Sequence, residues 1–142
     1  MRYDFAAYDK DGNLAVVVEA ILHLNTDAVW ASELRRNILA HGALPRADFF
    51  MVVVPDKIYV WNGRADPQAE PAEIDARDLF APYFERIGIS PETIVSAAFE
   101  QLVFWWLNDL ARSVPADVDA RLRQSGIVDV VAGGHVLSQL AA

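Results

Sequence analysis

Residues 3–22, with the sequence YDFAAYDKDGNLAVVVEAIL, decide the fold of this chain. An apolar run at residues 3–8 is followed by DKDGN, a turn sequence in which Gly12 can take a positive φ. The next run, LAVVVEAIL at residues 14–22, is rich in β-branched residues and predicts a buried strand. Two such runs joined by a short Asp/Gly turn predict an antiparallel hairpin.

One acid, Glu19, interrupts the second of these strands. A carboxylate within an apolar strand is costly to desolvate unless it is paired or binds a cation. With the turn at residues 9–13, Asp4 lies opposite a residue near position 18, which makes Asp4 and Glu19 neighbours within one residue of register. Mg²⁺ needs only one or two protein carboxylates besides water and phosphate oxygens. The sequence therefore predicts a metal site at these two acids.

The remainder of residues 1–64 predicts one helix and a second hairpin. The helix starts near Asp27 and ends at Gly42, and Asn25 or Thr26 can cap its first turn. Its buried stripe, spaced every four residues, comprises Trp30, Leu34 and Ile38. The apolar runs DFFMVVV and KIYVWN, joined by a Pro-Asp turn, then predict two antiparallel strands.

The second half of the chain, residues 65–142, has mainly helical patterns. The boundary lies in GRADPQAEPAEIDA, whose Pro and Gly residues indicate a surface connection. Apolar spacing and helix-start signals predict helices near residues 79–87, 90–112 and 116–124. The tail after Gly134 is either a last strand or an unpacked end.

The run FEQLVFWWLNDL, at residues 99–110, places apolar side chains on every side of a helix. One side can pack on the sheet, and the other is either covered by neighbouring helices or exposed as an interface. Because Trp and Phe are enriched in interface cores, we expect a homodimer in which this segment takes part.

The composition is that of one domain spanning residues 1–142, with 54% hydrophobic residues, enough for a sizeable core. The net charge of -8 repels phosphate, so we expect contact with nucleic acid to be weak. The absence of cysteine excludes disulfides and thiol catalysis. With neither a signal-peptide core nor a long uncharged apolar run, we expect a cytoplasmic protein that does not enter membranes.

The first hairpin, the helix VWASELRRNILAHG and the hairpin FFMVVVPDKIYVW together resemble the PD-(D/E)XK, or restriction-endonuclease-like, nuclease superfamily, and within it small bacterial proteins. The resemblance covers residues 3–61 and implies an α/β fold with a mixed sheet flanked by helices, here with a helical C-terminal half. In that family a carboxylate in the first strand and Glu-x-Lys in the next hold Mg²⁺ and activate water for phosphodiester cleavage. Asp4 matches the first acid and Glu19 the second.

The match fails at the lysine, whose position is occupied by Ile21, and the proline before the first acid is replaced by Tyr3. An isoleucine can neither stabilise negative charge in the transition state nor exchange a proton. The loss of one such preorganised group costs about 3–4 kcal/mol, or roughly 10²–10³ in rate. The resemblance thus implies an impaired or inactive relative of these nucleases.

Side chains on the helix and strand can compensate for the missing lysine in part. Glu33 can add a third carboxylate, and Arg35 or Arg36 can hold a phosphate, although arginine is a poor proton carrier. His23 would share a strand face with residues 19 and 21. In a purely structural interpretation, Glu19 instead pairs with one of the two arginines.

Three functions follow from these patterns. The leading hypothesis is a degenerate restriction-endonuclease-like protein with little or no nuclease activity, acting as a homo-oligomeric binding or regulatory module. The second is an active Mg²⁺- or Mn²⁺-dependent nuclease with a rearranged site, in which Asp4 and Glu19 hold the metal, Glu33 assists and Arg36 or Arg35 holds phosphate. The third is a structural assembly protein without nucleic-acid contact.

Overall fold

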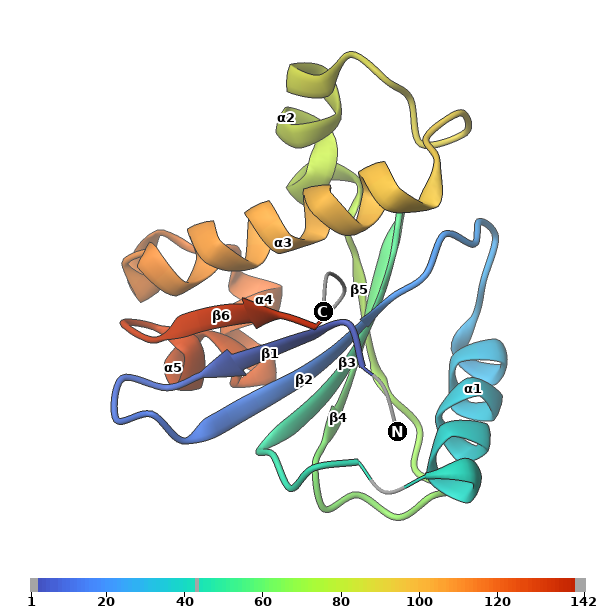
Figure 1. Ribbon diagram of the computed structural model, residues 1–142, viewed down its shortest axis with the longest axis vertical. Coiled ribbons are helices and arrows are strands. Elements are labelled where there is room, and N and C mark those ends of the chain that lie inside the picture. The colour runs from blue at the N-terminus through green and yellow to red at the C-terminus, as the bar shows by residue number, and fades with distance from the viewer. Residues whose placement is uncertain (1–2, 43, 140–142) are drawn as a thin grey trace.

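The computed structural model describes residues 3–42 and 44–139. Its architecture is α/β, as the sequence predicts, with helices on both faces of a six-stranded mixed sheet (Figure 1). The elements in chain order are β1 (Phe5–Tyr8), β2 (Leu14–Ala20), α1 (Ala28–His41), β3 (Phe49–Val54), β4 (Lys57–Asn62), β5 (Ala72–Asp75), α2 (Arg77–Ile87), α3 (Ser96–Arg112), a 3₁₀ turn (Pro115–Asp117), α4 (Ala120–Ser125), α5 (Ile127–Val131) and β6 (His135–Ser138).

The strands lie side by side in the order β5-β4-β3-β2-β1-β6. β2 and β3 are parallel and are connected through α1, whereas the other neighbouring pairs are antiparallel. Both predicted hairpins are confirmed: Phe5 pairs with Val18 in the first, and Val53 pairs with Ile58 in the second. The tail after Gly134 forms β6 and pairs with β1, so it is a strand rather than an unpacked end.

The sheet separates two hydrophobic cores, because side chains alternate between its faces along each strand. Helices α2 to α5 cover one face, and α1 covers the other (Figure 1). The core under α1 is built from Val17, Ala31, Phe50, Val52, Val54, Tyr59 and Trp61. The β3 run FFMVVV is apolar without interruption because it contributes to both cores.

The apolar run of α3 at residues 102–107 is buried except for Phe104 and Trp105, which are half-buried. The rings of Phe104 and Phe5 stack with their centroids 5.5 Å apart, and Trp105 meets Tyr83 of α2 edge-on at 5.1 Å. None of residues 102–107 is exposed. The sheet and the neighbouring helices thus cover most of the apolar side chains from which we expected a dimer interface, leaving Phe104 and Trp105 half-buried, and the homodimer stays a prediction.

The cap of α1 differs from the prediction. Asp27 caps the helix, because its carboxylate accepts a hydrogen bond from the backbone N–H of Trp30 at 2.8 Å. Asn25 instead forms a left-handed residue of the preceding turn, with a φ of 59°. The Thr26 hydroxyl is used elsewhere, in a buried 2.8 Å hydrogen bond with the Tyr59 hydroxyl.

The second half also departs from the predicted boundaries. The stretch interpreted as a surface connection contains β5, an edge strand paired with β4. Ser90 starts a separate turn, in which its carbonyl accepts from the N–H of Ile94, and α3 begins only at Ser96. The helix predicted at residues 116–124 is a 3₁₀ turn followed by α4, and α5 was not predicted.

The longest described helix, α3, has 17 residues. Within residues 3–42 and 44–139, none of the helices is both long and apolar enough to cross a membrane.

Candidate functional site

Asp4 and Glu19 lie opposite each other at one end of the β1–β2 hairpin. Phe5 pairs with Val18, so the next residues outward, Asp4 and Glu19, are in register. The backbone N–H of Asp4 donates to the Val18 carbonyl at 3.1 Å. The Asp4 Oδ2 atom accepts a hydrogen bond from the backbone N–H of Ala20 at 2.8 Å. The juxtaposition predicted from the turn is therefore present, and the Asp4 side chain is anchored to β2.

Both acids are on the side of the sheet that α1 covers. Phe5 belongs to the core on the opposite face, so its neighbour Asp4 faces α1. Val17 belongs to the core under α1, and Glu19, two residues further along β2, shares its face. Both side chains are half-buried. Carboxylate oxygens are the ligands that Mg²⁺ and Mn²⁺ prefer, and the Asp4 Oδ1 atom accepts no hydrogen bond from a described residue, so this atom is chemically suited to a divalent cation.

Ile21 occupies an apolar position beside the two acids. Its backbone N–H donates to the Val53 carbonyl at 2.9 Å, which continues the parallel pairing just beyond the end of β2. Its side chain packs against the core under α1, as do Tyr3 and Trp30. No ammonium group is therefore available where the resemblance expects a lysine.

The expected helpers on α1 do not join the pair. Glu33 is exposed, and no group of three or more His, Asp or Glu side chains suited to a metal ion occurs in the described part of the chain, so Glu33 forms no cluster with Asp4 and Glu19. Arg36 is half-buried and forms no ion pair with a described residue.

His23 also lies outside the predicted alternation. β2 ends at Ala20, and the backbone N–H of His23 donates back to the Ile21 carbonyl. The imidazole is exposed, and its centroid lies 5.1 Å from that of the Trp30 ring. The expectation that His23 shares a strand face with residues 19 and 21 is wrong, because the chain has already left the strand.

Arg35 is buried, with only 3% of its surface exposed, and its guanidinium reaches the loop after β4. Nη1 donates to the Asp66 carbonyl at 2.9 Å, and Nη2 donates to the Ala65 carbonyl at 2.8 Å. The guanidinium also lies 5.5 Å from the centre of the Trp61 ring. Burial lowers the pKa of Arg35, and the Asp66 carboxylate partly opposes that shift. Both Nη atoms of Arg35 are thus committed to this loop, and among the described residues Arg35 forms no ion pair with Glu19.

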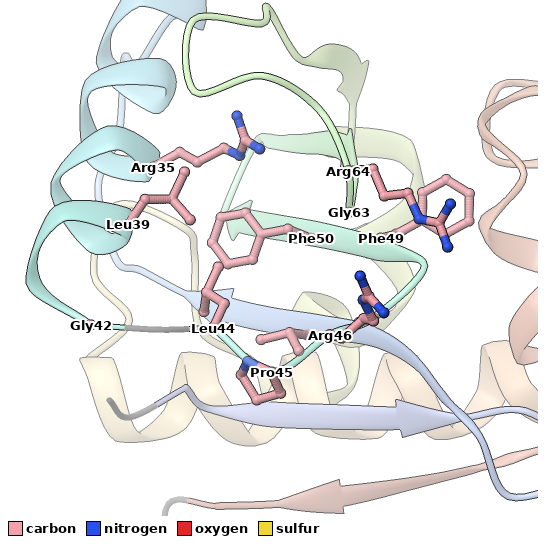
Figure 2. A pocket seen from close by; sticks show the side chains of 12 residues that line it. Arg35, Leu39, Gly42, Leu44, Pro45, Arg46, Phe49, Phe50, Gly63 and Arg64 are labelled. Carbon is pink, nitrogen blue, oxygen red and sulfur yellow. The ribbon is translucent and has the colours of Figure 1, made fainter.

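A cavity of about 450 Å³ lies between the end of α1, the segment before β3 and the end of β4 (Figure 2). Arg35, Arg46 and Arg64 line it, together with the apolar side chains of Leu39, Leu44 and Phe50. None of the acidic residues that the structure describes lines it. It opens on the same face of the sheet as the two acids, since Val17 contributes to its wall.

The sequence reasoning missed this cluster of arginines, although one signal was available. Arg46 precedes β3 and Arg64 follows β4. Phe49 pairs with Asn62, so the hairpin register brings the two arginines to the same end of the sheet. The register argument that placed Asp4 next to Glu19 would also have placed Arg46 near Arg64. The burial of Arg35 could not be predicted in this way, because it depends on the path of the loop after β4.

No family model matches the chain, and comparison with curated proteins and with solved structures likewise gives no match.

Proposed function

We propose that this chain is a degenerate restriction-endonuclease-like protein that retains a two-carboxylate site for a divalent cation but has little or no nuclease activity. The observation that carries the proposal is the register of Asp4 and Glu19 on one sheet face, with Ile21 beside them. The order of elements supports it as well, because a hairpin, a helix and a second hairpin follow each other as the resemblance implies.

The chemistry of the pair accounts for the proposed loss of activity. Mg²⁺ or Mn²⁺ held by the two carboxylates would supply a Lewis acid for a phosphate oxygen. Catalysis also needs a cationic group beside the attacking water, and Ile21 provides none. We therefore expect this chain to bind a divalent cation although it cleaves nucleic acid weakly or not at all.

Calorimetric titration with Mn²⁺ tests the metal site. We expect one site that is lost in Asp4→Ala and in Glu19→Ala. The matched control is Glu33→Ala, which removes an exposed acid of α1 and should leave binding unchanged. If the native protein binds no Mn²⁺, the metal site is wrong and the structural assembly protein becomes the better hypothesis.

Plasmid nicking in Mn²⁺ tests the loss of catalysis. We expect Ile21→Lys to raise the rate by roughly 10²–10³, the range associated with one preorganised group. Adding Glu19→Ala to that variant should abolish the gain, and Leu22→Lys, which adds a lysine one residue away, should give none. Nicking by the native protein that Glu19→Ala abolishes would instead establish an active nuclease. An Ile21→Lys variant that folds and binds Mn²⁺ without cleaving contradicts the proposed kinship.

The proposal includes a homo-oligomeric binding or regulatory role, for which oligomeric state is the first test. Light scattering over a range of concentrations should reveal a dimer at micromolar protein. A monomer under these conditions contradicts that part of the proposal without affecting the metal site.

A further inference from the structure

The cavity lined by Arg35, Arg46 and Arg64 is a concentrated positive site on an acidic protein. The chain has 12 Lys and Arg against 20 Asp and Glu, yet three arginines and no acid line this one cavity. Figure 2 shows Arg35 reaching from α1 on one side, with Arg46 and Arg64 on the other and Phe50 between them. The positive charge gathered here favours an anionic ligand.

Arg46 and Arg64 are available to such a ligand. Both side chains are exposed, and neither guanidinium forms a hydrogen bond or ion pair with a described residue. The same two arginines also border a second hollow, whose acidic lining residue, Asp48, is exposed. Guanidinium groups bind phosphate and carboxylate through paired N–H donors.

Arg35 adds a third guanidinium to the wall of the cavity. It is 3% exposed, and both of its Nη atoms are bonded to loop carbonyls. Its Nε–H is buried and finds no acceptor among the described residues. This guanidinium therefore contributes positive charge to the site, whereas the exposed Arg46 and Arg64 are the groups that a ligand can reach.

The remaining wall decides what kind of anion fits. Leu39, Leu44 and Phe50 supply an apolar surface, and the volume of about 450 Å³ is in the range of small-molecule sites. A phosphate monoester carries about −1.5 to −2 charges near neutral pH, which two free guanidiniums match better than a singly charged carboxylate. We propose that this cavity binds an organic phosphate monoester, its phosphate held by Arg46 and Arg64 and its apolar body against Leu39, Leu44 and Phe50.

Calorimetry with phenyl phosphate tests this proposal. The titration contains a chelator, so that the result is independent of the Asp4–Glu19 metal site. We expect saturable binding of one molecule, at least tenfold tighter than inorganic phosphate because of the ring. Phenol and benzoate should each bind at least tenfold more weakly than phenyl phosphate. Affinity should fall as salt rises, since Arg46 and Arg64 are exposed.

The decisive variant is Arg46→Gln with Arg64→Gln, which removes both free guanidiniums and leaves the buried Arg35 in place. We expect its affinity for phenyl phosphate to fall at least tenfold. The charge-matched control is Lys10→Gln with Arg123→Gln, two exposed residues elsewhere on the molecule, and it should stay within twofold of the native protein. A urea unfolding curve for each protein verifies that it is folded.

Three results would overturn the proposal. One is the absence of saturable binding of phenyl phosphate at millimolar concentration. Another is an equal loss of affinity in the control variant, which would mean that net charge alone is being measured. The third is equal affinity for benzoate, which would exclude selection of a phosphate.

Discussion

The Asp4 carboxylate accepts a hydrogen bond from the backbone N–H of Ala20 at 2.8 Å, across the open end of the β1–β2 hairpin. We expect Asp4→Ala to lower the free energy of unfolding by about 1 kcal/mol, because the Ala20 N–H loses its acceptor. Asp4→Asn keeps an acceptor oxygen and should cost less than half as much. Urea unfolding measures both values. Equal losses in the two variants would mean that the charge, rather than the hydrogen bond, stabilises the hairpin.

A second prediction concerns Asp27, the residue that caps the N-terminus of α1. Asp27 accepts from the Trp30 N–H at 2.8 Å and satisfies one of the free donors in the first turn. Asp27→Ala should therefore cost about 1 kcal/mol of stability, and Asp27→Asn, which can still cap, only a small part of it. The check is the shift in the urea midpoint at constant slope. Two variants of equal stability would disprove the capping role.

Tyr59 is fully buried, and burial raises its pKa above the ordinary value of 10.0, which the Thr26 hydrogen bond opposes only in part. The folded state therefore holds this proton more tightly than the unfolded state. It follows that the unfolding free energy is insensitive to this group below about pH 10 and falls as the pH rises above it. Tyr59→Phe should flatten that fall, measured by urea unfolding at several alkaline pH values.

Tyr83 also makes the unfolding free energy depend on pH in this alkaline range. Burial and its 2.6 Å hydrogen bond to the Asp109 carboxylate both raise its pKa. Some slope should thus persist in Tyr59→Phe and decrease further when Tyr83→Phe is added, with a remainder from Lys57, whose pKa is raised chiefly by its hydrogen bond to Glu73. An unchanged slope in the double variant would assign the alkaline loss of stability to other groups.

Arg77 lowers the pKa of the Asp75 carboxyl to about 2 through a direct side-chain hydrogen bond at 2.6 Å. Arg77→Ala should raise that pKa toward the ordinary 3.8, as followed by NMR titration. The matched control is Arg112→Ala, which breaks an ion pair with Asp109 instead. Because the lowered pKa stabilises the fold fully above pH 3.8 and less as the pH falls toward 2, the stability lost in Arg77→Ala should be constant above pH 3.8 and should vanish as the pH falls toward 2. The pair is exposed, so that effect is small.

Gly63 lies where the two ends of the β3–β4 hairpin approach closely. Its N–H donates to the Asp48 carbonyl at 2.8 Å, and an added Cβ would overlap the Ala47 carbonyl oxygen. Gly63→Ala should destabilise the protein by roughly 1–3 kcal/mol or more. Gly12→Ala, whose Cβ would meet no neighbour, should cost only about 1 kcal/mol for its positive φ. Thermal melts compare the two, and a smaller loss for Gly63→Ala would contradict the close approach.

The sequence by itself determined what depends on neighbours along the chain. The turn DKDGN sets the register of its hairpin to within one residue, so the sequence could predict that Asp4 and Glu19 are neighbours. Their exact pairing depends on a one-residue shift of register between Ala7 and Tyr8, which the turn did not predict. Alternating and β-branched runs likewise predicted β2, β3 and β4. The face occupied by the side chain at position 21 could also be predicted, because residues two apart along a strand lie on the same face and residue 21 is two positions from Glu19.

The tertiary structure alone decided what depends on segments distant in the chain. The run around Trp105 could have been an interface or a core, and the packing of the second half of the chain made most of it core, with Trp106 buried and Trp105 half-buried against Tyr83. Arg35 could have paired with Glu19, and the path of the loop after β4 turned its guanidinium toward Ala65 instead. The spacing of apolar residues indicates which face of a helix or strand a residue occupies. Its burial and its contact partners depend on which distant segment packs against that face, and only the packing of the whole chain determines this.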